Sequence, residues 1–332
     1  MSEIATRVVD IDPERPGGEE IAQAVRVLRD EGLVAIPTET VYGLAARASS
    51  PQAVRRIFEA KGRPATNPLI LHVSSVEQAR RLARNWPAEA QKLARAFWPG
   101  PLTMVVERSQ QVDDQVCAGL DTVAIRMPAH PVARAVIEEL GEPVAAPSAN
   151  RYTEVSPTNA DHVLDGLGGR IELIVDAGPT LVGLESTLVR LREGAVEILR
   201  PGMIDRSQLA KVVDIIDEPG APRVVDDEVA RPSPGLSKRH YSPGVPVCIA
   251  ASPEFQKVAE SAGPSSVIFA LRGVETQATV IEMPSEPEEY ARELYGMLHR
   301  YDADGVDRII VEMPPDEPRW EAIRDRLRRA AT

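Results

Sequence analysis

Residues 33–44 read Leu-Val-Ala-Ile-Pro-Thr-Glu-Thr-Val-Tyr-Gly-Leu, and the rest of the chain is interpreted outward from them. The four apolar residues 33–36 predict a short buried strand, which Pro37 ends because it cannot donate to the ladder. In extended backbone, alternate positions after the proline would point three hydroxyls the same way, those of Thr38, Thr40 and Tyr42. Two interpretations remain open: the rim of a pocket, or a strand that ends in an inert polar loop.

The composition and charge of the chain indicate which classes of protein it can belong to. A chain of 332 residues is long enough for two domains, and its 43% hydrophobic content is ordinary for a globular fold. Its net charge of −12, with both halves acidic, disfavours tight binding of nucleic acid through phosphates. We predict no transmembrane helix, because no window of eighteen residues is apolar, and we expect a cytoplasmic protein because the N-terminus lacks an apolar signal core.

Several common catalytic patterns are missing from the sequence. There is no phosphate-binding P-loop, no Gly-x-Gly-x-x-Gly fingerprint and no Gly-x-Ser-x-Gly elbow. Cys117 and Cys248 lie far apart and the five histidines are scattered, so the spacing predicts neither a zinc site nor a disulfide framework. Chemistry that depends on a protein nucleophile or a resident metal is therefore not indicated.

The alternation of strands and helices predicts two α/β domains. Residues 1–216 form the first domain in this interpretation, and residues 247–332 form a small α/β unit. The segment 217–246 holds six prolines and three glycines, which is typical of a linker. It also contains Lys238-Arg-His-Tyr241, an unusual cluster for an inert spacer, so it could act as a lid over a site.

Polar residues repeatedly follow the predicted strands. Lys61 and Arg63 would point the same way on extended backbone and could bind a phosphate, or they could be a solvated helix end. Ser148 and Asn150 repeat this spacing, although such residues usually make turns. His72 alone is more typical of a satisfied core histidine, and Arg126 implies a carboxylate or phosphate partner, which could be a structural ion pair.

Taken in order, these motifs resemble the YrdC-like family, the L-threonylcarbamoyladenylate synthases. The resemblance rests on Pro37–Leu44, Lys61-Gly-Arg63 with Asn67-Pro-Leu, Phe97-Trp-Pro-Gly-Pro-Leu-Thr103, Ala124-Ile-Arg-Met-Pro128, Ala146-Pro-Ser-Ala-Asn150 with Ser156-Pro-Thr158, Glu185-Ser-Thr187 and Arg200-Pro-Gly202. Residues 234–243 resemble the linker of the long, two-domain form. The implied fold is a twisted open mixed α/β sheet with a concave active-site face, a Pro-rich linker and a small Rossmann-like domain.

The resemblance implies a reaction without a protein nucleophile. L-threonine, bicarbonate or CO2 and ATP would give threonylcarbamoyl-AMP and pyrophosphate, the first step of tRNA N6-threonylcarbamoyladenosine modification. A separate tRNA threonylcarbamoyl transferase would take the product, so tRNA binding by this chain would be weak or indirect. Mg2+ is expected with ATP.

The resemblance also implies roles for particular residues. L-threonine would be bound by Thr40, His72, Arg126, Ser148 and Ser186, with Arg126 on its carboxylate. ATP would be bound by Lys61, Arg63, Asn67, Thr122, Asn150, Ser156, Arg200 and, from the linker, Tyr241. Lys61 and Arg63 would be the catalytic pair.

One departure and two alternatives accompany the resemblance. The family often has a glycine before the Ser-Pro-Thr motif, where this chain reads Arg-Tyr-Thr-Glu-Val over residues 151–155. The main alternative is a double-stranded RNA or tRNA binding module without catalysis, which the acidic charge disfavours. The second is the carbamoyltransferase of hydrogenase maturation, which has cysteine-rich zinc motifs that two lone cysteines do not match.

Overall fold

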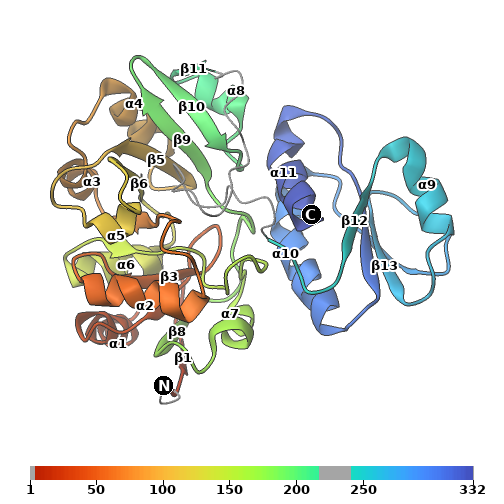
Figure 1. Ribbon diagram of the computed structural model, residues 1–332, viewed down its shortest axis with the longest axis horizontal. Coiled ribbons are helices and arrows are strands. Elements are labelled where there is room, and N and C mark those ends of the chain that lie inside the picture. Colours follow the sequence, from red (N-terminus) through yellow and green to blue (C-terminus); the bar gives the residue numbers. More distant parts are fainter. Residues whose placement is uncertain (1–3, 217–240, 332) are drawn as a thin grey trace.

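We describe a computed structural model of the chain, covering residues 4–216 and 241–331. The chain folds into a large and a small α/β unit that lie side by side, with the C-terminus in the small unit (Figure 1). Eleven strands form a mixed sheet in the large unit, and four strands form a parallel sheet in the small one.

The order of strands across the large sheet differs from their order in the sequence. From edge to edge they are β1 (Arg7–Asp10), β8 (Leu173–Asp176), β2 (Val34–Ile36), β3 (Gly43–Arg47), β7 (Val144–Ala145), β4 (Ile70–His72), β6 (Thr122–Arg126), β5 (Leu102–Glu107), β9 (Thr187–Arg192), β10 (Ala195–Arg200) and β11 (Asp214–Ile216). Parallel pairs such as β4 and β6 occur beside antiparallel ones such as β5 and β6. This confirms the predicted mixed α/β sheet.

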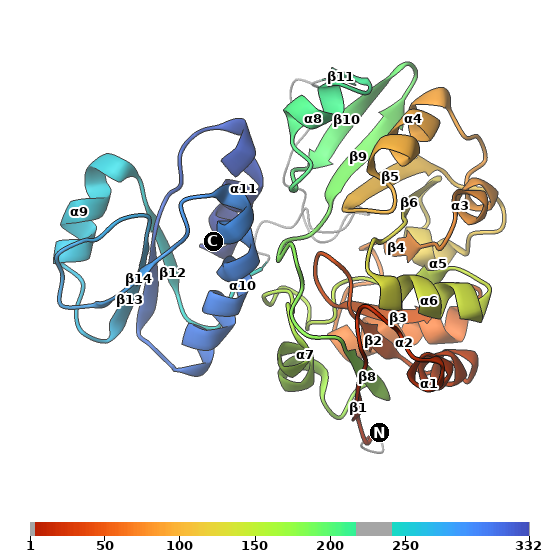
Figure 2. The same ribbon diagram turned by 180° about the vertical axis from the view of Figure 1, so that it is seen from behind.

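Helices cover both faces of the large sheet. On one face, α1 (Gly18–Arg29) and α6 (Pro131–Leu140) pack against β2, β7 and β8 (Figure 2). The other face is covered by α2 (Pro51–Lys61), α3 (Val76–Leu82), α4 (Ala88–Phe97), α5 (Asp114–Cys117) and α7 (Ala160–Leu167). Since both faces of β2 are buried, every residue of that strand is apolar, as expected for a central strand.

Capping residues explain where several helices begin. The Ser50-Pro51 pair in the sequence predicts a helix start, and in the structure the Ser50 hydroxyl accepts a hydrogen bond from the Ala53 amide, with Pro51 in the first turn of α2. Asp205 forms a capping box at the start of α8 (Arg206–Ala210). The sequence also predicts Thr158 as the cap of α7, and this was wrong: Asn159 accepts the hydrogen bond from the helix, so the helix begins one residue later.

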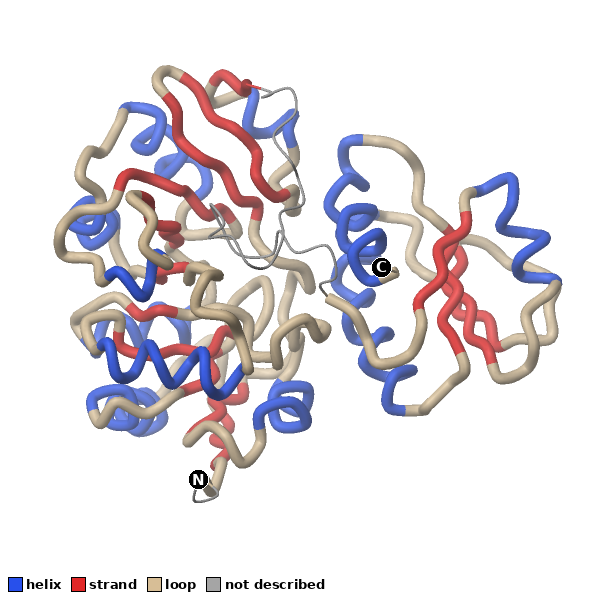
Figure 3. Tube along the Cα trace, viewed as in Figure 1, coloured by secondary structure: helices blue, strands red, loops and turns tan. Residues whose placement is uncertain are grey.

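The small unit is a doubly wound parallel sheet, which agrees with the Rossmann-like prediction. Its strands lie in the order β12 (Val247–Ala250), β15 (Arg308–Glu312), β13 (Ser266–Ala270) and β14 (Thr279–Glu282). Figure 3 shows α10 (Pro287–Ala303) and α11 (Glu321–Ala330) between this sheet and the large unit, with α9 (Ser252–Glu260) on the far face. A 3-10 turn, Pro318–Trp320, precedes α11.

An apolar core joins the two units. Tyr295 and Leu298 of α10 belong to the same buried cluster as Val41, Val155 and Leu184 of the large unit. Gly183 lies directly on α10, where an added Cβ would come within 2.4 Å of the Ala291 carbonyl oxygen. The units therefore share buried surface, which fixes α10 and α11 against the large unit.

The opening stretch partly departs from its prediction. Val34–Ile36 is a strand, but residues 37–42 are not one, and Gly43 begins β3, which runs antiparallel to β2. The Tyr42 side chain consequently turns into the core, where its hydroxyl donates to the Gly178 carbonyl at 2.7 Å. The expectation that Tyr42 joins Thr38 and Thr40 at a pocket was wrong.

Two further predictions concern the chain as a whole. Within the described residues no helix is both long and apolar enough to cross a membrane. The boundaries at residues 216 and 247 stay a prediction, because most of the segment between them lies outside the described residues.

Candidate active site

The candidate site lies on the sheet face that carries α1 and α6, beyond the part that these helices cover. On this face Val144 of β7 packs under α6, and the register places His72 next to it. Arg126 follows beside His72, and Thr103 beside Arg126. The face thus changes from apolar to polar across four strands, and a pocket opens over the polar part, lined by His72 and Arg126 among others.

All five residues predicted to bind L-threonine line this pocket. They are Thr40, His72, Arg126, Ser148 and Ser186. They come from the segment after β2, the ends of β4 and β6, the loop after β7 and the residue before β9. The set was implied by the resemblance to the YrdC-like family, and the role of each residue stays a prediction.

Arg126 has the carboxylate partner that the sequence analysis allowed, a buried ion pair with Glu39, although the sequence did not indicate which residue it is. Its guanidinium lies 2.7 Å from the Glu39 carboxylate and donates to the Thr40 hydroxyl at 2.8 Å. Glu39 also accepts from the Ala129 amide. If residues 38–42 formed an extended strand, the Glu39 side chain would point away from those of Thr38 and Thr40. These residues are not a strand, so Glu39 can reach Arg126. The ion pair with Glu39 holds the Arg126 guanidinium in place. The Glu39 charge also offsets the Arg126 charge on this side of the pocket.

His72 is buried and unpaired, which is unusual for a core histidine. Neither ring nitrogen has a hydrogen-bond partner among the described residues. Burial lowers the pKa of His72 well below its usual range, and the nearby Arg126 charge lowers it further. A neutral imidazole therefore offers one donor and one acceptor inside the pocket, and such groups are normally satisfied by a ligand or water.

Lys61 organises the loop that carries Ser148 and Asn150. Its ammonium group donates to the carbonyl oxygens of both residues. Burial lowers the pKa of Lys61 well below its usual range, and the neighbouring Arg63 lowers it further. Lys61 ends α2, as the interpretation of a solvated helix end required. Its side chain is buried, however, so that interpretation was wrong.

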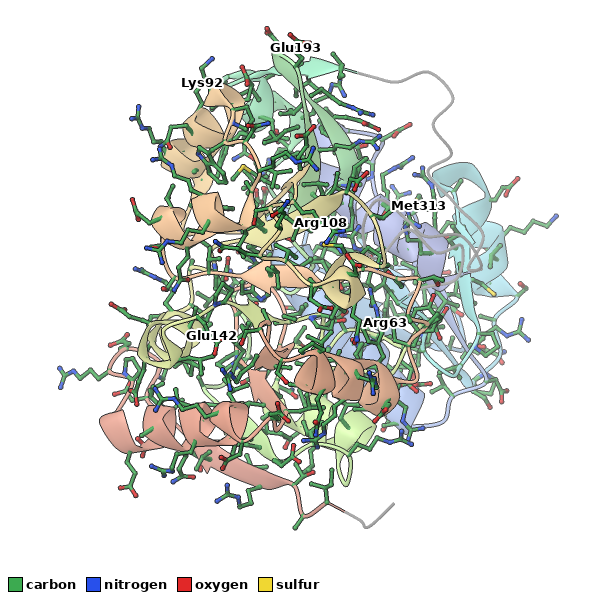
Figure 4. The ribbon with its side chains drawn as sticks, turned by 60° about the vertical axis from the view of Figure 1, so that its left-hand side comes forward. Arg63, Lys92, Arg108, Glu142, Glu193 and Met313 are labelled. Carbon is green, nitrogen blue, oxygen red and sulfur yellow. The ribbon has the colours of Figure 1, made fainter. Side chains whose placement is uncertain are left out.

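Arg63 lies beyond the end of α2 and lines the pocket; Figure 4 labels it. It donates to the Asn67 side-chain oxygen at 2.7 Å and to the Pro68 carbonyl at 2.8 Å. The Asn67 amide nitrogen and the Asn150 side-chain oxygen are buried without a hydrogen-bond partner among the described residues. Such buried polar atoms are normally satisfied by a ligand or water, although neither asparagine lines the pocket itself.

Arg200 and Tyr241 form the wall on the side of the small unit. Arg200 donates to both the carbonyl and the hydroxyl of Ser186, and one of its nitrogens lies 3.5 Å from the Tyr241 hydroxyl. Ser186 also shares a 2.7 Å hydrogen bond with Thr103, a second residue that sequence reasoning missed. Tyr241 is the described member of the 238–241 cluster; Lys238 to His240 lie outside the described residues.

Five residues of the predicted ATP set do not line this pocket: Lys61, Asn67, Thr122, Asn150 and Ser156. Lys61, Asn67 and Ser156 each bond to a residue that does line it. Thr122 lies elsewhere. It begins β6, whereas Arg126 ends that strand, and it lines a separate groove with Arg190 and Glu193. Figure 4 labels Glu193 far from Arg63. The role of Thr122 in ATP binding stays a prediction.

The departure at residues 151–155 has a structural consequence. Thr153 adopts a left-handed backbone conformation, with φ of 73°. A β-branched residue rarely takes this conformation, whereas glycine takes it readily. The loop is nevertheless held, since Asn150 donates to the Arg151 and Glu154 carbonyls and the Thr153 carbonyl accepts from the Ser242 amide.

Comparison with known proteins identifies the two units. A family model described as "Telomere recombination", which covers the Sua5, YciO and YrdC proteins, matches residues 26–202. A second model, described as "Threonylcarbamoyl-AMP synthase, C-terminal domain", matches residues 204–332. A threonylcarbamoyl-AMP synthase from Pyrococcus abyssi is 42% identical over 318 residues, 93% of each chain. The chain belongs to the threonylcarbamoyl-AMP synthase family.

Other members of the family extend this relation. The threonylcarbamoyl-AMP synthase of Bacillus subtilis is 41% identical over 324 residues and covers 94% of this chain and 93% of its own. The crystal structure of P. abyssi Sua5 complexed with L-threonine matches with a TM-score of 0.89 at 39% identity, over 98% of this chain and 97% of that one. E. coli YciO, at 23% identity, TM-score 0.54 and coverage of 59% and 96%, shares the fold of the large unit.

Membership of the threonylcarbamoyl-AMP synthase family resolves the predicted function. The protein is an ATP-using enzyme of nucleotidyl transfer, and the resemblance stated from the motifs is confirmed. These relatives are named as synthases, not as RNA-binding modules, so the main alternative is not favoured.

Proposed function

We propose that this pocket joins L-threonine, bicarbonate or CO2 and ATP into threonylcarbamoyl-AMP and pyrophosphate. The threonine amine would add to CO2 and lose a proton, giving a carbamate. A carbamate oxygen would then attack the α-phosphorus of ATP, and the bond from that phosphorus to the oxygen of the leaving pyrophosphate would break. The protein has to align two anions and neutralise charge, which suits a site rich in cations.

The observation that supports the proposal is that one pocket is lined by residues of both predicted sets. The whole set predicted for L-threonine lines it, together with Arg63, Arg200 and Tyr241 of the set predicted for ATP. Both ring nitrogens of His72, which lines the pocket, lack a hydrogen-bond partner among the described residues, and this supports a polar ligand there. The P. abyssi relative was crystallised with L-threonine, which supports that substrate.

On the threonine side, Arg126 is assigned to the carboxylate. Its Glu39 and Thr40 partners leave it oriented before the substrate arrives, which reduces the ordering cost of binding. The neutral His72 ring would hydrogen-bond the substrate, with Ser148 and Ser186 completing the contacts.

On the nucleotide side, cations would take the role that a P-loop has in other enzymes. Arg63 and Arg200 line the pocket and are assigned to ATP phosphates, and Tyr241 would close over the nucleotide. Lys61 would act with Arg63 in catalysis by holding the Ser148–Asn150 loop and adding positive charge. Asn67, Thr122, Asn150 and Ser156 complete the proposed ATP set.

Mg2+ would enter as part of the ATP substrate. Among residues 4–216 and 241–331, no group of three or more His, Cys, Asp or Glu side chains could hold a metal ion. Glu185, which lines the pocket, is paired with Arg326, and Glu39, which lies between Thr38 and Thr40, is paired with Arg126. Phosphate oxygens and water are therefore the ligands that we assign to Mg2+.

The product would leave for a tRNA threonylcarbamoyl transferase. The net charge of −12 supports weak or indirect tRNA binding by this chain. Use of ATP and delivery to tRNA modification support residence in the cytoplasm.

The test supplies L-threonine, bicarbonate and Mg-ATP together and follows pyrophosphate, with mass spectrometry for the product. We expect threonylcarbamoyl-AMP only when all three substrates are present. Pyrophosphate at full rate without threonine, or no product with all three, would contradict the proposal.

A further inference from the structure

One arginine of the small unit lies completely inside the junction with the large unit. Arg326, on α11, is 1% exposed. Its Nε donates to the Glu185 carboxylate at 2.8 Å, and another nitrogen donates to the Pro201 carbonyl at 3.0 Å. Asp325, its neighbour on the helix, accepts a third hydrogen bond at 2.6 Å. A buried cation with partners from two units is fixed in place.

Glu185 connects this arginine to the nucleotide side of the pocket. Its other oxygen accepts from the Ser156 hydroxyl at 2.6 Å, and Tyr295 of α10 donates to the oxygen that Arg326 binds. Burial alone would raise the pKa of Glu185, but the Arg326 and Arg200 charges outweigh this and keep the pKa below its usual value. The carboxylate is therefore ionised and depends on its cation.

Arg326 also holds Tyr241. Its guanidinium lies over the tyrosine ring, 5.1 Å from the centroid, and Tyr295 stacks on the same ring at 5.9 Å. The Tyr241 backbone is left-handed, with φ of 62°. An aromatic residue rarely takes this conformation, which persists only where the surroundings impose it.

We propose that Arg326 is a positioning residue for the nucleotide half of the active site. It acts through Glu185 on Ser156 and through Tyr241 on Arg200, and three of these four residues belong to the set assigned to ATP. The inference rests on the proposed function, and it gives the small unit a specific task. Without the guanidinium, Glu185 keeps a buried charge without its cation, so Ser156 and Tyr241 lose their fixed positions.

The threonine half gives the internal contrast. Thr40 and Arg126 are held by Glu39 and by each other, all within the large unit. Loss of Arg326 should therefore weaken ATP binding and leave L-threonine binding nearly unchanged. A variant that merely destabilised the fold would weaken both.

The experiment compares Arg326→Met and Arg326→Lys with Arg324→Met in the full-length chain. Arg324 lies on the same helix and binds Pro314 and Asp316 of the small unit, so it is a matched control. Calorimetric titration gives the Kd of Mg-ATP and of L-threonine separately, and circular dichroism checks folding. We expect Arg326→Met to weaken ATP binding at least about tenfold, Arg326→Lys to recover part of it, and threonine binding to stay within about twofold.

The outcomes separate this inference from the proposed function. Equal ATP affinity in Arg326→Met and Arg324→Met, or equal losses for ATP and threonine, would overturn the role of Arg326. Arg326→Lys keeps a buried cation, so it still provides the comparison if Arg326→Met does not fold. Because binding is measured without turnover, a wild-type chain that makes no product would refute the proposed function alone.

Discussion

The two halves of the pocket are held in place by different parts of the molecule. On the threonine side, Arg126 and Thr40 are braced by Glu39, which belongs to the same unit. On the nucleotide side, Ser156 is held by Glu185, which binds Tyr295 of α10 and Arg326 of α11, and Tyr241 packs against the same two side chains. The difference indicates that the polar contacts of the threonine half lie within the large unit, whereas those of the nucleotide half include side chains of the small one.

The largest expected effect comes from removing the two cations on the nucleotide side of the pocket, Arg63 and Lys61. Arg63→Ala should reduce kcat by about 100-fold to 1000-fold, because a charge that stabilises the transition state would be lost. Lys61→Ala should have a comparable effect, since the Ser148–Asn150 loop would lose its anchor. The measurement is pyrophosphate release with saturating substrates.

The control for these variants is Lys92→Ala on the exposed surface of α4 (Figure 4). It removes one positive charge without touching the pocket, so its rate should equal that of wild type. Wild-type rates in Arg63→Ala as well would show that the cation has only a structural role.

A second prediction sharpens the comparison at the junction of the units. Gly183→Ala would force a left-handed alanine and place its Cβ 2.4 Å from the Ala291 carbonyl oxygen of α10. We expect ATP affinity to fall at least about tenfold, or about 1.4 kcal/mol. L-threonine affinity should fall as well, because the Gly183 amide donates to the Thr40 carbonyl.

Gly178→Ala is the matched control for Gly183→Ala. Gly178 lies five residues earlier with the same φ of 80° and has open space around its Cβ position. It should therefore carry only the backbone strain, about 1–2 kcal/mol of folding free energy. Similar ATP affinities in the two variants would show that α10 does not support the nucleotide half.

A third prediction concerns pH at the same junction. His162 of α7 and His299 of α10 stack with ring centroids 3.9 Å apart, and His299 contacts the Ser156 carbonyl. Burial, and then the His299 charge, lower the pKa of His162 to about 3, while Asp165 and Asp302 face His299 and partly oppose the effect of its burial. The unfolded chain therefore binds more protons than the folded chain between about pH 6.5 and pH 3.

Stability should consequently fall as the pH drops below about 6.5, and it should be independent of these groups above that value. His162→Phe keeps an aromatic contact without a titrating group, so its thermal midpoint should fall less between pH 7 and pH 5 than that of wild type. Parallel curves for the two proteins would exclude this stack as a source of acid sensitivity.

The smallest expected effect is at the loop where the family often has glycine. Thr153→Gly should relieve the left-handed threonine and raise the free energy of unfolding by about 1 kcal/mol. Denaturant unfolding measures the change, and Tyr152→Gly in the same loop, where φ is not positive, should be destabilising instead. A loss of stability in Thr153→Gly would show that its side chain matters more than its backbone.

Much of the scaffold followed from local patterns. The apolar runs at residues 102–107, 122–126 and 173–176 predict strands, and the structure has strands with these bounds, Leu102–Glu107, Thr122–Arg126 and Leu173–Asp176. β3 was missed, since Gly-Leu-Ala-Ala-Arg lacks the β-branched residues that favour strands. Its pairing with β2 is a tertiary feature that no local signal contains.

The sequence could predict site residues that belong to a motif. It could not predict contacts between residues that are far apart in the chain. His72 and Arg126, which the resemblance assigned to the same ligand, lie on adjacent strands. The Glu39 pair with Arg126 joins residues 87 positions apart, and the Arg326 pair with Glu185 joins residues 141 apart. Such contacts depend on the packing of complete units, so resemblance to a family could not supply them.

The most direct test of the account is a crystal structure with L-threonine and a non-hydrolysable ATP analogue. We predict threonine beside His72 and Arg126, and the nucleotide phosphates within hydrogen-bond distance of Arg63 and Arg200 under the Tyr241 ring. Nucleotide bound instead in the separate groove beside Arg190, without contact to Arg63, Arg200 or Tyr241, would contradict the division of the pocket.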